Sequence, residues 1–186
     1  MGLKPIARGE LVELISPVDT AIDRERTPKN VFAEYAAGLI DRRRDLVLLD
    51  DVEPVRFYLR APSPMETRVM QRALIPAPPA DLEMLTPEQS QLIQAKKAKL
   101  DELVTDPVQL RLHTLWLETV CTANLRVALV KVDGLEWDYR REDICGVWAW
   151  PLEAIGGLDD DTRNFLGAAA VSLGRLTPEK KSPSGS

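Results

Sequence analysis

The chain has 186 residues, a hydrophobic fraction of 45% and a formal net charge of -5. This length fits one domain, or one domain with a small appendage, and the composition allows a sizeable core. The acidic balance argues against nucleic acid as the main partner, and the first residues show no long apolar segment of the kind that directs secretion.

The N-terminal part, residues 1–75, is predicted to mix strands and helices. Its elements are bounded by turn residues or by a capping residue followed by proline. The expected elements are a short strand within 10–15, a helix from Thr27-Pro28 to about Ile40, a buried strand at 46–49, a second strand at 55–59 and a helix that starts at Ser63-Pro64.

The strand at 55–59 alternates apolar and polar side chains. One face is apolar, and the other face carries Arg56, Tyr58 and Arg60. Strict alternation is typical of a strand with one buried face. We therefore expect the arginines to face water or a partner.

Residues 76–85 are predicted to be a proline-rich linker, beginning with the stiff, extended sequence PAPPA. The linker separates the mixed part from a helical part at 86–176. Thr86, Pro87 and Gln89 predict a helix start with a capping box, and this helix is expected to continue to about Val104. Its connection to the next helix is short, so the two should form an antiparallel hairpin.

The central element is one long helix predicted over 106–132. Asp106 is a good N-cap and Pro107 suits the first helical position. Apolar side chains lie on most sides of this helix, so it should be buried or touch a partner. Charged or titratable residues within it exclude a membrane span, namely Arg111, His113, Glu118 and Arg126.

Three of the four tryptophans follow this helix: Trp137, Trp148 and Trp150. A segment this aromatic must pack onto something. One alternative is that it packs on the C-terminal end of the central helix. The other is that it forms an exposed anchor surface, since Trp is over-represented among binding hot spots. Both alternatives can hold together.

A last helix is predicted over 162–176, after three acidic residues that complement its dipole. Small residues from Gly167 to Ala170 and at Gly174 suit close contact with another helix. The polar segment 177–186 should be disordered. The chain is thus predicted to be an α+β protein, mainly α, with a small N-terminal strand element followed by a helical bundle around the long central helix.

The sequence has no pattern that predicts catalysis, a cofactor or a metal site. His113 is the only histidine, and we interpret it as a partly buried structural residue. Cys121 and Cys145 match neither a zinc spacing nor a CxxC redox pair, and they are expected to be two reduced thiols. The motifs HExxH, GxGxxG and the P-loop are absent. We therefore expect that the protein is not an enzyme.

Two stretches of the sequence carry a resemblance to a known family. In the first, 51–74, an acidic turn with a proline leads into a V-x-F-x-L-R strand and then into a helix start of the type Pro-Ser-x-x-Glu. In the second, 129–181, an apolar helix is followed by a Gly-Leu-x-Trp segment, Pro151-Leu152, a helix of small residues and a Leu-Thr-x-Glu-Lys-Lys tail. Together they resemble the tail assembly chaperones of long-tailed phages.

The resemblance implies a non-catalytic protein that binds tape-measure and tail-tube proteins in the host cytoplasm during tail assembly. It implies no nucleic acid and no membrane partner, and a homo-oligomer is left open. The alternative is a structural adaptor or minor component that is retained in the virion. The hypothesis for partner contacts names the strand face and the tryptophan segment: Arg56, Tyr58, Arg60, Trp137, Trp148 and Trp150.

Overall fold

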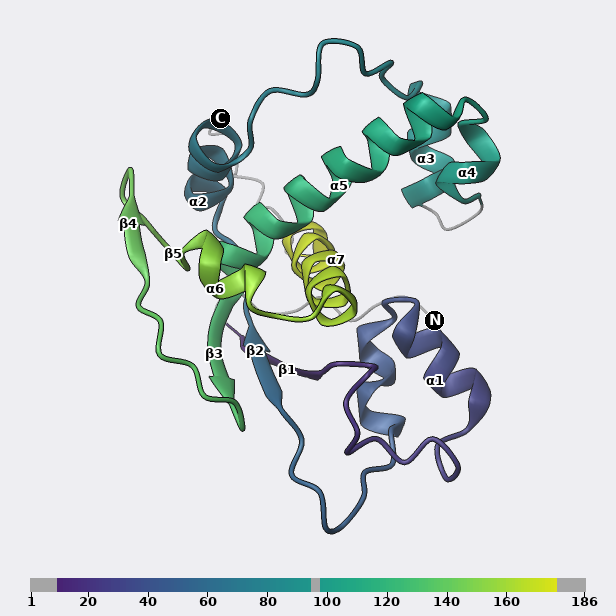
Figure 1. Cartoon of the computed structure of the whole chain (residues 1–186), viewed down its shortest axis with the longest axis vertical. Helices are drawn as coiled ribbons and strands as arrows, with labels where there is room; N and C mark the ends of the chain where they lie inside the picture. The colour runs from purple at the N-terminus through teal and green to yellow at the C-terminus, as the bar shows by residue number, and fades with distance from the viewer. Residues whose placement is uncertain (1–9, 95–97, 177–186) are drawn as a thin grey trace, which may run out of the picture.

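Helices cover one side of a small sheet in the computed structural model, which describes residues 10–94 and 98–176 (Figure 1). The fold is α+β and mainly helical, with a strand element near the N-terminus and a long central helix. The predicted fold class is therefore confirmed. The predicted disordered tail at 177–186 lies outside the described residues.

Three short strands form an antiparallel sheet in the order β1-β2-β3, with β1 at Val12–Ile15, β2 at Arg56–Leu59 and β3 at Leu129–Asp133. The strands predicted within 10–15 and at 55–59 are confirmed. The alternation also holds, because Phe57 and Leu59 are buried while Arg56 and Tyr58 are half-buried. The sheet joins segments from both sides of the proline-rich linker.

The central helix, α5, spans Pro107–Ala128 and ends earlier than predicted. Its start is as expected, since Asp106 Oδ1 accepts a hydrogen bond from Val108 N at 2.8 Å. Leu129 is already extended, with φ -67 and ψ 122, and it begins β3. The prediction of a helix up to Val132 is wrong because Leu129 and residues 131–133 pair with β2, and this tertiary pairing outweighs a local helical pattern.

Between β1 and β2 the chain forms helix α1 at Lys29–Ala36 and a 3-10 helix, η1, at Ile40–Asp45. The predicted helix reached Ile40, but Gly38 takes a left-handed φ of +88 shortly after α1 ends. The strand predicted at 46–49 is also wrong. Leu48 makes a single bridge to Ile22, because the segment around Ile22 is a turn and offers no extended partner.

The next helices are α2 at Pro64–Val69, a π-helical turn, η2, at Met70–Leu74, α3 at Pro87–Gln94 and α4 at Leu100–Leu103. The predicted capping box at the start of α2 is present: Glu66 N donates to Ser63 Oγ at 3.2 Å, and Ser63 N donates to Glu66 Oε2 at 2.7 Å. Thr86 and Gln89 exchange the same two bonds at the start of α3.

The single helix predicted from Pro87 to Val104 is not continuous. Residues 95–97 lie outside the described residues, but Lys99 has an extended ψ of 161 immediately before α4. A hydrogen bond of 3.0 Å from Lys99 N to Glu102 Oε2 starts this separate short helix. Glu102 therefore caps the start of a new helix inside the stretch that was predicted to be a single helix.

The C-terminal part contains the strands β4 at Glu142–Ile144 and β5 at Val147–Ala149, and the helices α6 at Leu152–Gly156 and α7 at Asp160–Leu176. The two strands form a separate antiparallel hairpin. Helix α7 packs along α5, and the small residues predicted for close helix contact include Gly167 at this contact. The last helix and its small-residue contact are thus confirmed.

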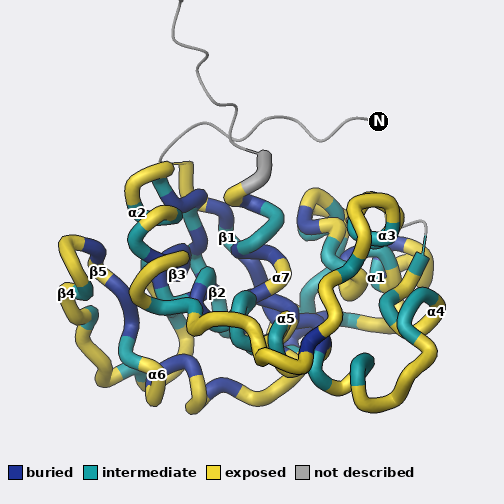
Figure 2. The backbone as a smooth tube through the Cα atoms, turned by 90° about the horizontal axis from the view of Figure 1, so that it is seen from above, coloured by how far each residue is buried: buried dark blue, intermediate teal, exposed yellow. Residues whose placement is uncertain are grey.

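The main core lies between the inner face of the sheet, the C-terminal half of α5, α7 and the segment around Trp150 (Figure 2). Tyr35 of α1 is fully buried there and ties α1 to β1, because Ile15 N donates to its hydroxyl at 3.1 Å. A smaller cluster joins η2 to the β4–β5 hairpin. By contrast, the N-terminal half of α5 keeps apolar side chains exposed, namely Val108, Leu115 and Leu117.

Candidate partner-binding surfaces

The β4–β5 hairpin presents one of the three tryptophans to solvent. Its turn consists of Cys145 and Gly146, which both have positive φ, 54 and 85, as a two-residue type I′ turn requires. Asp143 Oδ1 accepts a hydrogen bond from Gly146 N at 2.7 Å and holds the turn. Trp148 on β5 is 57% exposed, more than any other described aromatic residue. The hairpin therefore offers a large apolar side chain on a defined backbone.

Trp150 lies in the core and is only 8% exposed. Its Nε1 donates a hydrogen bond to the Leu129 carbonyl at 2.7 Å. Trp137 packs edge-on against it, with ring centroids 5.5 Å apart. Trp137 is half-buried, and among the described residues its Nε1 finds no hydrogen-bond partner. The tryptophan segment thus does both things considered from the sequence: Trp150 packs on the end of the central helix, and Trp148 faces solvent.

The last turn of α5 is held by hydrogen bonds from three separate segments. Backbone carbonyls at a helix end have no partner within the helix and must find one elsewhere. Trp150 N donates to the Arg126 carbonyl at 2.9 Å, the Arg141 guanidinium to the Val127 carbonyl at 3.0 Å, and Arg60 N to the Ala128 carbonyl at 2.9 Å. A cation at this position also complements the negative end of the helix dipole.

Arg141 and Arg126 fix the hairpin to this helix end. The Arg141 guanidinium also donates to the Trp148 carbonyl, and Arg126 donates to the Trp150 carbonyl at 2.6 Å and to Glu142 at 2.7 Å. Burial lowers the pKa of Arg141 below its ordinary value, and the nearby positive charge of Arg60 lowers it further. The hairpin is therefore placed by charged contacts as well as by apolar packing.

The polar face of β2 is paired within the molecule. Arg56 forms an ion pair with Glu13 on β1, and Tyr58 lies below the Lys131 ammonium, which is 5.4 Å from its ring centre. Lys131 in turn binds Asp133 at 2.6 Å, which raises the pKa of Lys131. The sequence identified Arg56 and Tyr58 as residues on the outer face, but it gave no sign of partners on the neighbouring strands.

Arg60 is engaged in the same way at the end of β2. It makes two hydrogen bonds to the Glu66 carboxylate, one of 2.8 Å and one of 2.5 Å. This contact lowers the pKa of Glu66 to about 2, and the hydrogen bond from Ser63 N contributes. Arg60 thus holds the start of α2 against the sheet, and any contact with a partner would compete with this pair.

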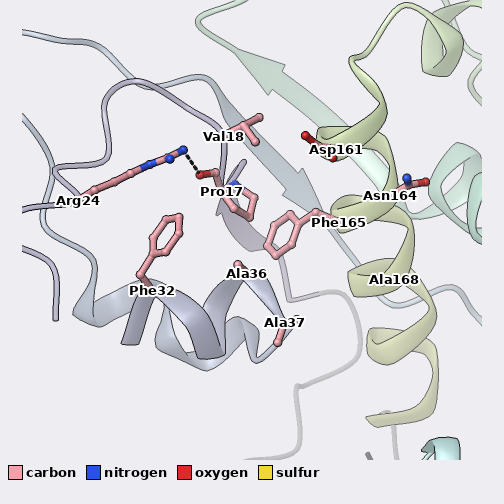
Figure 3. Close-up of a pocket in the computed structure, with 11 residues that line it drawn as sticks. Pro17, Val18, Arg24, Phe32, Ala36, Ala37, Asp161, Asn164, Phe165 and Ala168 are labelled. Atoms are coloured by element: carbon pink, nitrogen blue, oxygen red, sulfur yellow. Dashed lines mark hydrogen bonds between the residues drawn. The ribbon is translucent and has the colours of Figure 1, made fainter. Parts of the chain in front are cut away.

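An open apolar groove of about 530 Å³ lies between α1 and the first half of α7. Figure 3 shows the rings of Phe32 and Phe165 facing the hollow from opposite sides, with Pro17 between them. Small side chains of both helices complete the lining: Ala36, Ala37 and Ala168. An apolar floor with little side-chain bulk leaves room for inserted side chains of another chain.

The rim of this groove is polar. Arg24 donates a hydrogen bond to the Pro17 carbonyl at 3.2 Å, and its guanidinium lies 5.1 Å from the centre of the Phe32 ring (Figure 3). Asp161 and Asn164 form the opposite rim on α7. Sequence reasoning missed this site. The only sign of the groove in the sequence was Phe32, a large aromatic residue that lies outside the apolar stripe of the predicted helix.

Other kinds of site are not found in the described part of the chain. No group of three or more His, Cys, Asp or Glu residues there is arranged to hold a metal ion. Cys121 is half-buried on α5, Cys145 is exposed at the hairpin turn, and neither is in a disulfide. His113 is buried, 5% exposed, beside the segment before α3. Among the described helices, none is long and apolar enough to cross a bilayer.

No family model matches the chain, and comparisons with curated proteins and with solved structures find no match either.

Proposed function

We propose that the protein is a tail assembly chaperone of a long-tailed phage. In this proposal it is not a catalyst. It binds apolar helical segments of the tape-measure protein and of tail-tube subunits in the host cytoplasm, and it releases them as the tail is built. The observation that carries the proposal is the open apolar groove between α1 and α7, together with the resemblance in the segments 51–74 and 129–181.

The groove has the chemistry that an amphipathic helix requires. Such a helix inserts large apolar side chains spaced three and four residues apart into an apolar groove. The facing rings of Phe32 and Phe165 can receive these side chains, and Ala36 and Ala168 allow the backbone to come close. Arg24 and Asp161 at the rims can bind the polar edge of the helix, which gives it a preferred orientation.

Trp148 supports the proposal as a second contact. Exposed tryptophans on a well-placed backbone are frequent anchors at protein interfaces. The hairpin that carries Trp148 is fixed to the end of α5 by Arg141 and Arg126. A partner that covers Trp148 would therefore bury it without first ordering the segment. The strand face of Arg56, Tyr58 and Arg60 is a weaker candidate, because its charges are already paired.

The test is affinity capture of the tagged full-length chain from cells that produce the phage, with mass spectrometry of the bound proteins and of finished particles. We expect tape-measure or tail-tube subunits to be captured, and the protein to be missing from finished particles. Recovery of the protein in the particles would instead show a structural component retained in the virion. Capture of unrelated proteins alone would refute both assignments.

A pair of variants on one helix tests the groove itself. Ala36→Glu places a charge in the apolar lining, whereas Ala33→Glu places the same charge on an exposed position of α1 outside the groove. Both residues are exposed, so both variants should fold. We expect Ala36→Glu to reduce capture about tenfold or more, since a buried unpaired charge is costly, and Ala33→Glu to leave it unchanged. Equal capture by both variants would exclude the groove as the binding site.

A further inference from the structure

The N-terminal half of α5 has an exposed apolar stripe. This half extends away from the sheet toward α3 and α4 (Figure 1). Val108 is 65% exposed and Leu115 is 49% exposed. The two residues are seven positions apart and therefore lie on one side of the helix. An apolar stripe on a helix is normally covered by another element.

The same stripe continues into a groove on the C-terminal half of α5. This second groove, of about 530 Å³, is lined on its floor by Leu115, Thr119 and Thr122 of α5. Its walls are formed by η2 with Leu74 and by α6 with Leu152, which is 58% exposed. One stripe thus has a bare half and a walled half, and Leu115 lies where the two halves meet.

Two opposite charges flank Leu115 on this stripe. Arg111 and Glu118 are both exposed, one turn before and about one turn after Leu115. In the part of the chain that the structure describes, neither has an ion-pair partner. They are too far apart along the helix to pair with each other, because only positions three or four apart face one another.

We infer that this face of α5 binds a second copy of the chain, with the two α5 helices antiparallel around a two-fold axis at Leu115. The axis places Leu115 against its equivalent and brings Arg111 of each copy opposite Glu118 of the other. It also carries the exposed Val108 of each copy into the walled groove of the other, toward Leu74 and Leu152. This inference goes beyond the proposed function and does not involve the groove between α1 and α7.

The pattern favours a second copy over an unrelated partner. A two-fold interface uses the same patch on both molecules, so the patch must complement itself. The patch of Arg111, Leu115 and Glu118 complements itself in this way. When two copies run antiparallel, the arginine of each lies opposite the glutamate of the other. The two halves of the stripe also complement each other: the two-fold axis places the half without walls, which carries Val108, against the half walled by Leu74 and Leu152 of the other copy.

The test is sedimentation velocity of the purified full-length chain over a range of concentrations. We expect a monomer–dimer equilibrium for the natural sequence. Arg111→Glu and Glu118→Arg each create two like-charge contacts across the axis, and each should weaken the dimer about tenfold or more. The double variant carrying both substitutions restores the opposite pairing and should recover the dimer.

Two leucine variants complete the test. Leu115→Glu should abolish the dimer, whereas Leu117→Glu is the matched control, because Leu117 is 45% exposed on the opposite side of α5. Circular dichroism checks that each variant is folded. A chain that stays monomeric at all concentrations would overturn the inference. So would a dimer that responds equally to Leu115→Glu and Leu117→Glu, or one that the double charge variant fails to restore.

Discussion

Gly167 of α7 lies against Cys121 of α5 so closely that a Cβ atom at position 167 would be 2.8 Å from the Cβ of Cys121. Backbone atoms of Cys121 would be only 3.2 Å away. Real Cβ atoms essentially never come this close to another carbon. The two longest helices therefore pack at a distance that only glycine permits at this position.

Gly167→Ala should destabilise the protein. The added methyl group must push α7 away from α5, and overpacking of this kind costs about 1–3 kcal/mol. The better helix propensity of alanine offsets about 1 kcal/mol of that cost. We expect a lower free energy of unfolding and a lower Tm, measured by urea and thermal unfolding followed by circular dichroism.

Gly156→Ala is the matched control for Gly167→Ala. Gly156 also lies in a helix, but a Cβ there would meet no atom within 4 Å. Its substitution should leave the stability unchanged or raise it by up to about 1 kcal/mol. If Gly167→Ala is as stable as Gly156→Ala, the close α5–α7 contact is not present in solution.

Trp150→Ala and Trp148→Ala should differ strongly in stability, although the residues are two positions apart. Removal of the buried Trp150 ring leaves a cavity and costs about 3–5 kcal/mol, and the Leu129 carbonyl also loses its donor. Removal of the exposed Trp148 ring should change stability by about 0.5 kcal/mol or less. Urea unfolding of both variants measures this difference. Equal losses of stability would contradict an orientation in which Trp148 faces solvent and Trp150 faces the core.

Glu66→Gln should remove an acid-sensitive contribution to stability. The pKa of Glu66 is lowered from an ordinary value of 4.5 to about 2, first by the hydrogen bonds from Arg60. A lowered folded-state pKa means that the ionised carboxylate stabilises the fold above pH 4.5 and that this stabilisation is lost as the pH falls toward 2. At pH 7 the substitution should cost about 1–2 kcal/mol.

The pH dependence identifies the cause of the Glu66→Gln effect. Urea unfolding of the natural sequence and of the variant at pH 7, 4 and 3 gives the difference in free energy at each pH. We expect this difference to shrink as the pH falls. A difference that stays constant down to pH 3 would mean that the carboxylate charge does not stabilise the contact between α2 and β2.

Cys145→Asn should stabilise the β4–β5 hairpin. Cys145 has a φ of 54, a conformation that is unfavourable for most side chains. Asparagine tolerates this region, and Asn-Gly is a preferred pair for a type I′ turn. The gain should be about 0.5–1 kcal/mol, detected as a higher Tm. Cys145→Val is the contrasting variant, because a β-branched residue at this φ should lower the Tm. The opposite order would contradict the turn geometry.

Local signals in the sequence were enough to locate most helix starts. Asp106, Ser63 and Thr86 each cap a helix as predicted, because a cap depends on bonds within one turn of chain. Helix ends were less predictable. Helix α5 stops at Ala128 because the following residues pair with β2, which lies far away in the sequence. The residues around Ala128 carry no local pattern that predicts this pairing with β2.

The surfaces were harder to predict than the elements. Alternation along β2 correctly separated Phe57 from Tyr58, but the ion pair of Arg56 with Glu13 depends on the register between two distant strands. The groove at Phe32 arises where α1 meets α7, and only the folded chain brings these helices together. Trp148 is exposed because it lies on the outer face of β5, between the buried Val147 and Ala149. Trp150 lies beyond the end of β5 and is buried against the end of α5.

The position of β2 between β1 and β3 has a consequence for how the chain folds during synthesis. β1 and β2 are made early, but β3 follows only after the whole of α5. Pairing between such distant segments closes a long loop and is slow. Even a complete sheet would have its apolar face only partly covered, by Tyr35 of α1 and Leu125 of α5, until α7 is made and packs on it. The growing chain must therefore remain protected from aggregation until almost all of its described residues have left the ribosome.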